Sequence, residues 1–192
     1  MNLFKKPVVT GLITTALTLG LVGTASAQNL AKFTISEQAA KKTLLKNEIN
    51  ADTARKIIDK CIDIANKANM PITIFILTPT GQIVASHRMD GQVPINIETA
   101  LLKAQSVLVT RDSTHLRANM IATNIPQQIK WHALGVFTTS GGLPIVVDGQ
   151  MIGTIGIGGG SKDEEMAYEA LTEIVGPQPA LAPNAPPAAP AK

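Results

Sequence analysis

The chain has 192 residues, of which 17 are Lys or Arg and 14 are Asp or Glu, so its formal net charge at neutral pH is only +3. This balance, together with the lack of a basic stripe with interleaved aromatic residues, argues against a nucleic-acid-binding protein. The single cysteine, Cys61, excludes an intramolecular disulfide and any zinc or iron–sulfur site built from several cysteines.

The first 27 residues have the pattern of a secretory signal peptide. Lys5 and Lys6 form a short basic region, residues 8–22 are uncharged and mostly apolar, and small residues precede a cleavage site after Ala27. We expect an exported protein, periplasmic or secreted, with no transmembrane span after cleavage; the alternative is an uncleaved membrane anchor. Cleavage removes 2 of the 17 basic side chains and leaves 15 against 14 acidic ones.

The mature chain opens with a helical pattern. Residues 37–68 predict either one long helix or two helices that break near residues 47–50. After the break, apolar residues recur at intervals of three and four, which is typical of an amphipathic helix. Cys61 lies on this apolar face, so we expect a buried, unreactive thiol.

Two strands should follow this helix. Residues 72–77 are a continuous apolar and β-branched run, as expected of a central strand buried on both faces. A Pro-Thr-Gly turn leads into residues 82–88, which predict a second, antiparallel strand. A helix is expected over residues 97–110 and a short helical turn within residues 111–120. Residues 121–134 are hard to place, and another strand is expected over residues 133–139.

The remaining predicted elements form a hairpin and a helix. Residues 143–147 and 151–157 predict two strands joined by an Asp148-Gly149 turn. Ser161 and Glu164 fit a capping box for a helix that runs to about residue 175. The sequence therefore predicts one α+β domain, residues 28–175, with about five antiparallel strands and helices covering the sheet. Residues 176–192 are rich in Pro and Ala and predict a disordered tail.

Several segments, in the right order and spacing, resemble the GlcG/HbpS-type haem-binding proteins, a domain also found as the C-terminal part of PduO-type proteins. The similarity covers about residues 35–174. It implies a profilin-like α/β sandwich with a five-stranded antiparallel sheet, in dimers that build into homo-oligomers. The segments are Arg88-Met89-Asp90-Gly91, the helix with Ala100, Lys103 and Ala104, the run Gly141-Gly142-Leu143-Pro144-Ile145-Val146, the Asp148-Gly149 turn, and the glycine-rich strand before Asp163-Glu164.

The resemblance implies an exported, oligomeric protein that binds haem and either sequesters it or degrades it slowly, with the haem iron as its only metal. An alternative is an accessory factor or enzyme that acts on a small carboxylate or aldehyde and has no role for haem. A third is a purely structural oligomer whose tail binds a partner. The resemblance assigns no catalytic residue and leaves open whether the protein is an enzyme.

His87, Arg88 and Met89 form the first group of candidate haem-binding residues. Haem iron usually takes a histidine as axial ligand, with methionine also used. Hydrophobic neighbours of His87 would hold the porphyrin, and Arg88 would pair with a propionate. Alternatively, His87 is a half-exposed strand residue, and Arg88 pairs with Asp90 to hold the turn.

His115 and His132 are the other candidate haem ligands. His115 lies in a basic, polar segment that suits haem propionates, although such segments are commonly just solvated. His132 follows Trp131, and an aromatic side chain beside a histidine can line a pocket for a flat ligand or belong to a core or interface.

A small-ligand or anion pocket is the other candidate site. Backbone N–H groups at the start of a helix can bind an anion, and glycines let a ligand approach closely. The segment lacks the lysine of a phosphate loop, so nucleotide binding is not expected. The alternative is a closely packed joint between sheet and helix. The candidates are Gly141, Gly142, Gly158, Gly159, Gly160 and Ser161.

Overall fold

The structure is a computed structural model, which describes residues 47–183. The predicted signal peptide, the helix expected from residue 37 and residues 184–192 of the predicted tail lie outside this range. The described elements are α2 (Ala51–Lys67), β1 (Thr73–Leu77), β2 (Ile83–Arg88), α3 (Pro94–Thr110), α4 (Thr114–Ile121), α5 (Ile125–Ala133), β3 (Gly142–Val147), β4 (Gln150–Gly158) and α6 (Asp163–Val175).

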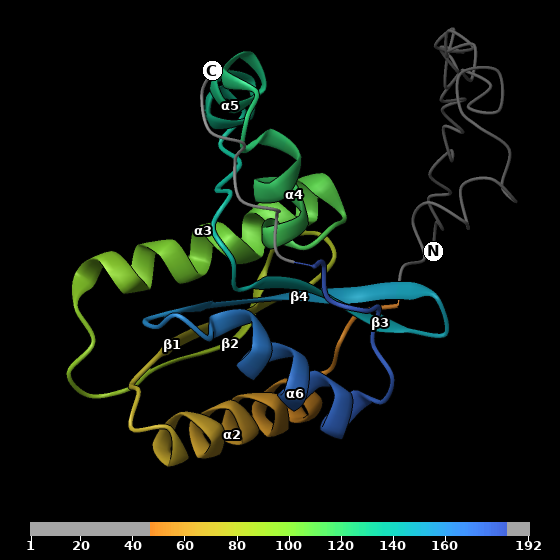
Figure 1. Cartoon of the computed structure of the whole chain (residues 1–192). Coiled ribbons are helices and arrows are strands. Elements are labelled where there is room, and N and C mark those ends of the chain that lie inside the picture. Colours follow the sequence, from red (N-terminus) through yellow and green to blue (C-terminus); the bar gives the residue numbers. More distant parts are fainter. Residues whose placement is uncertain (1–46, 184–192) are drawn as a thin grey trace, which may run out of the picture.

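The strands form one antiparallel sheet in the order β2-β1-β4-β3. Helix α3 covers one face of the sheet, and α2 and α6 lie side by side on the other (Figure 1). This arrangement confirms the predicted α+β class, the two hairpins and the central position of the strand at residues 73–77.

The five-stranded sheet is not found, because the described residues form four strands. The predicted strand at residues 133–139 is wrong: helix α5 ends at Ala133, and the chain continues as a loop up to β3. In this loop the backbone N–H of Phe137 donates to Ser106 Oγ at 2.7 Å, and Val136 is buried. The segment therefore anchors to α3 and pairs with none of the four described strands.

The predicted capping box at the start of α6 is also wrong. The helix begins at Asp163, and no side chain caps its first turn. The carboxylate of Asp163 instead accepts a hydrogen bond from the Gly160 N–H at 2.8 Å. Ser161 is exposed, and Glu164 points into the interior of the protein.

Helix α2 forms as its amphipathic spacing predicts. The side chain of Asn50 caps it by accepting a hydrogen bond from the Thr53 N–H at 2.8 Å. Its buried residues pack with α6 and the sheet into the main core. Cys61 lies in this core, and burial raises the pKa of its thiol to about 12. The expected burial of the thiol is confirmed, and its raised pKa agrees with low reactivity.

Glycines let helix α3 lie very close to β4. A Cβ atom on Gly156 would overlap the Ala100 carbonyl oxygen and lie 2.6 Å from the Ala104 nitrogen. A Cβ atom on Gly158 would lie 2.5 Å from the Asn96 carbonyl oxygen. Side chains at these two positions would therefore push α3 away from the sheet.

The outer edge of β3 is covered by the chain that follows α6. The side-chain amide of Gln178 donates to the Val146 carbonyl at 2.9 Å, and its oxygen accepts from the Val146 N–H at 3.0 Å. One glutamine side chain thus replaces a neighbouring strand at this position. At the opposite edge, β2 pairs only with β1 within residues 47–183.

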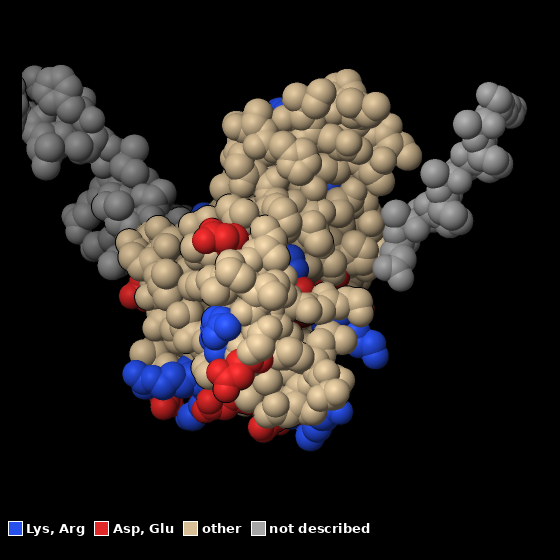
Figure 2. Space-filling view, turned by 90° about the vertical axis from the view of Figure 1, so that its left-hand side faces the viewer, with Lys and Arg blue, Asp and Glu red and all other residues tan. Residues whose placement is uncertain are grey.

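Helices α4 and α5 project from the α3 side of the sheet, and this part of the surface carries few charged atoms (Figures 1 and 2). The chain has no Asp or Glu between residues 113 and 147. None of the helices in the described stretch is both long and apolar enough to cross a membrane. The large exposed apolar side chains here are Leu116, Met120, Ile125, Ile129 and Leu134.

Candidate functional site

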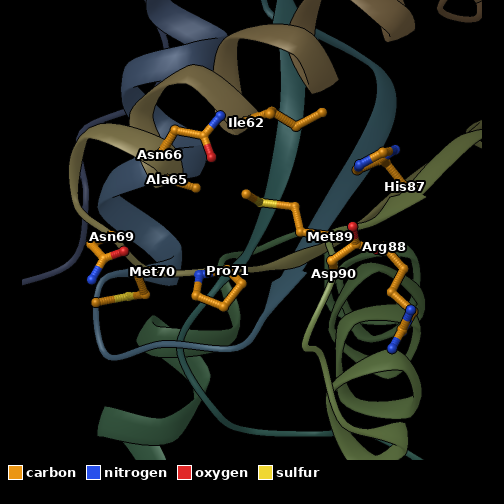
Figure 3. Close-up of a pocket in the computed structure, with 10 residues that line it drawn as sticks. All are labelled: Ile62, Ala65, Asn66, Asn69, Met70, Pro71, His87, Arg88, Met89 and Asp90. Carbon is orange, nitrogen blue, oxygen red and sulfur yellow. The ribbon is translucent and has the colours of Figure 1, made fainter.

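An open cavity of about 500 Å³ lies at the β2 edge of the sheet, between the end of α2, the loop that follows it and the end of β2. We call this cavity the β2 cleft (Figure 3). Apolar, amide and thioether groups face one another across it. Its lining residues are Ile62, Ala65, Asn66, Asn69, Met70, Pro71, His87, Arg88, Met89 and Asp90.

His87 faces the α2 side of the sheet. It pairs across the ladder with Ile74, whose side chain is in the core beneath α2, and opposite residues of an antiparallel pair share a face. Its side chain is exposed and makes no hydrogen bond to any other residue in the described range 47–183. Both ring nitrogens are therefore available to a ligand, and a neutral imidazole is a common metal donor.

Met89 extends into the middle of the β2 cleft, toward Ile62 and Ala65 (Figure 3). Its sulfur is 3.4 Å from the Ile72 N–H, which donates to it. The amide side chain of Asn66 lies across the cleft from Met89. The cleft thus combines an apolar patch with polar groups at its rim, as small-molecule sites usually do.

Arg88 points away from its two neighbours, as Figure 3 shows. Its guanidinium donates to the Gln92 carbonyl oxygen, at 2.7 Å from Nη2 and 3.2 Å from Nε. In the described residues it forms no ion pair with Asp90, so the pair considered as an alternative is not formed. The structure brings His87 and Met89 together and ties Arg88 to the loop before α3.

His115 and His132 lie elsewhere in the fold. The Nδ1 atom of His115 is 2.7 Å from Oε2 of Glu164, which also accepts a hydrogen bond from Ser140 Oγ at 3.0 Å. His132 is exposed in the last turn of α5, next to Trp131, over whose ring the Arg117 guanidinium lies at 4.8 Å. Neither histidine lines the β2 cleft.

A buried ion pair between Lys103 and Asp163 is the main feature that the sequence did not reveal. Lys103 Nζ lies 2.7 Å from Asp163 Oδ2, and the two side chains are only 4% and 3% exposed. The ammonium also donates to the Ile157 carbonyl at 2.7 Å. Burial raises the pKa of Asp163, and Lys103 opposes this shift. The sequence held one indication of this pair: Lys103 is a charged residue next to Ala104 on the face of α3 that is buried.

Close packing surrounds the five glycines of the glycine-rich candidate site, whereas Ser161 is exposed. A Cβ atom on Gly141 would lie 2.7 Å from Cβ of Asp163, and one on Gly159 would lie 2.7 Å from the Pro71 carbonyl oxygen. None of the six candidate residues lines the β2 cleft. The geometry supports the alternative explanation, a closely packed joint where β4 leads into α6. The six residues are Gly141, Gly142, Gly158, Gly159, Gly160 and Ser161.

The fold places the chain among small α+β proteins with one antiparallel sheet, and His87 lines a cleft at the edge of that sheet. Residues 49–172 match the family of haem-degrading, HbpS-like proteins. The chain belongs to this family.

Three comparisons describe the likeness. Protein GlcG of Escherichia coli is 30% identical over 93 residues, which are 48% of this chain and 68% of that protein. The crystal structure of a PduOC–heme complex superposes with a TM-score of 0.62 at 23% identity, over 66% of this chain and 95% of that one. For the crystal structure of HbpS, the TM-score is 0.61 at 22% identity, over 68% of this chain and 92% of that one. At these identities the two crystal structures support the shared fold.

Proposed function

We propose that this protein binds haem in the β2 cleft, with His87 as the axial ligand of the iron. The observation that carries the proposal is an imidazole with both nitrogens unbonded inside the described part of the chain, in a cleft that also holds the Met89 thioether. Membership of the HbpS-like family and the PduOC–heme complex of a similarly folded protein support the same ligand.

The residues of the β2 cleft suit haem chemically. Ile62 and Met89 offer apolar contact to a porphyrin face, and the amides of Asn66 and Asn69 can donate hydrogen bonds to propionates. Haem, when bound, would supply the redox-active iron that haem degradation requires. The protein would contribute the axial nitrogen, the orientation of the ring and partial exclusion of water.

We also propose export and assembly. The leader pattern of residues 1–27 supports cleavage after Ala27, and the exposed apolar side chains of α4 and α5 support association of copies. The profilin-like description and a dimer-based homo-oligomer follow from the family resemblance and are proposed on that ground. The protein exported by its native host should start at Gln28 and show a multimeric mass in light scattering. Retention of Met1 would refute the proposed cleavage, and a monomeric mass would refute the proposed assembly.

Removing the imidazole of His87 should weaken haem binding. Haemin titration of the wild-type protein should give a saturable Soret shift, and His87→Ala should raise the dissociation constant at least about tenfold, because an iron–nitrogen bond is lost. His132→Ala is the matched control, since it removes another exposed histidine, one outside the cleft. Equal binding by wild type and His87→Ala would rule out this ligand assignment.

A further inference from the structure

A second cavity, of about 630 Å³, lies at the opposite edge of the sheet, beside β3. Its roof is the chain segment 178–183, which we call the strap. Gln178 fixes one end of the strap to Val146, and the Asn119 side-chain amide donates to the Pro183 carbonyl at 2.6 Å at the other end. Between these anchors, Leu181 packs against the main core. The strap is therefore held over the cavity by specific contacts.

The interior of this cavity is mostly apolar. Leu143 and Leu171 form buried parts of its wall, and Met151 and Leu116 add further apolar surface. Leu181 closes it from the strap side. Such a volume, with a mostly apolar lining and several polar side chains, is typical of a site for a small organic ligand.

Arg111 is a cation at this cavity, and among residues 47–183 it has no anionic partner. In the described chain its guanidinium forms no salt bridge. Its one side-chain hydrogen bond there is a weak one, from Nη1 to the Met151 sulfur at 3.7 Å. Asp112 also lines the cavity, and its carboxylate is already paired with Arg117. The unmatched positive charge at the cavity favours an anionic ligand group.

The backbone of Arg111 supports a role for its side chain. It ends α3 in the left-handed conformation, with φ 62°, where glycine is the usual residue. An arginine in this conformation costs conformational energy, and such strain is often found at ligand sites. A second polar group lines the same cavity: the Tyr168 hydroxyl, which makes no hydrogen bond within residues 47–183.

We propose that the strap cavity binds a small amphipathic carboxylate, with an aliphatic body against the leucines and the carboxylate on Arg111. An Arg–carboxylate pair is a charge-assisted hydrogen bond with good geometric specificity. The Tyr168 hydroxyl can donate a further hydrogen bond to the ligand. The strap forms the roof of the site. This site is separate from the β2 cleft and from the proposed binding of haem.

Decanoate is a suitable probe, with decanol and decylammonium as probes of the same length but different charge. Calorimetric titration should show saturable binding of decanoate and at least about tenfold weaker binding of the other two, because only the carboxylate can pair with Arg111. Arg111→Gly should weaken decanoate binding at least about tenfold. It should also leave the thermal midpoint unchanged or higher, because glycine relieves the strained backbone.

Asn69→Gly is the matched control variant. It relieves a positive φ of 51° at the other edge of the sheet and should leave decanoate binding unchanged. Gln178→Ala, which frees one end of the strap, should weaken binding of decanoate. No saturable binding, equal binding of the three probes, or full affinity in Arg111→Gly would overturn the proposal. Loss of decanoate binding in haemin-loaded protein would overturn the separation of the two sites.

Discussion

Lys103→Met is expected to destabilise the protein by about 3–5 kcal/mol at neutral pH, because it leaves the buried carboxylate of Asp163 without its counter-charge. The loss should shrink on acidification. Burial already raises the pKa of Asp163, and removing Lys103 takes away the opposing effect. For a carboxyl whose folded-state pKa is raised, the stabilisation is fully present below the unfolded pKa of about 3.9 and is lost as the pH rises.

Urea unfolding of Lys103→Met at pH 4 and pH 8 measures both effects. The difference in the free energy of unfolding between the variant and the wild type should be smaller at pH 4 than at pH 8. Lys60→Met is the matched control, because its partner Glu173 is half exposed and the pair lies at the surface. The double variant Lys103→Met, Asp163→Leu should recover much of the loss, since no unpaired charge remains. A single variant as stable as the control at pH 8 would contradict this account.

Gly156→Val should cost about 3 kcal/mol, at the upper end of the range for overpacked sites. The added side chain would meet the backbone of α3 at Ala100 and Ala104, which cannot move aside as a flexible side chain could. The helix would have to move off the sheet and expose part of its buried face. Denaturant unfolding followed by circular dichroism gives the free energy of unfolding directly.

Gly91→Asn is the comparison for Gly156→Val. Gly91 has φ 83°, a conformation that asparagine tolerates, and nothing lies within 4 Å of an added Cβ. Its substitution should therefore cost less than about 1 kcal/mol. Similar losses in the two variants would mean that close packing against α3 is not what requires glycine at position 156.

The sequence predicted those elements whose residue pattern has a local cause. The apolar run of β1, the spacing of α2 and the Asp148-Gly149 turn all have local causes, and all were found as expected. Helix α5 was missed because it buries none of its residues and so has no apolar stripe pointing to a core. Asn124, whose side chain caps the helix by accepting from the Gln127 N–H, was the available signal.

The candidate site was predictable only in part. The sequence placed His87 and Met89 together because they are near neighbours at the end of one strand. Strand alternation predicts that Arg88 lies on the face opposite to its two neighbours. It does not predict that the guanidinium binds the Gln92 carbonyl oxygen. Glu164 was assigned to a helix cap, whereas its partners His115 and Ser140 lie 49 and 24 positions away in the chain. Long-range contacts of this kind leave no local pattern.

The two edges of the sheet differ, and the difference limits how copies could join through them. Gln178 occupies hydrogen-bonding positions on β3, so a visiting strand would have to displace it. Strand β2 offers its outer edge within residues 47–183. Within residues 47–183, two copies paired through β2 would each use the sheet edge that no other segment covers, and Gln178 would stand at the opposite edge. Association of this type closes at two molecules and cannot propagate into a fibre.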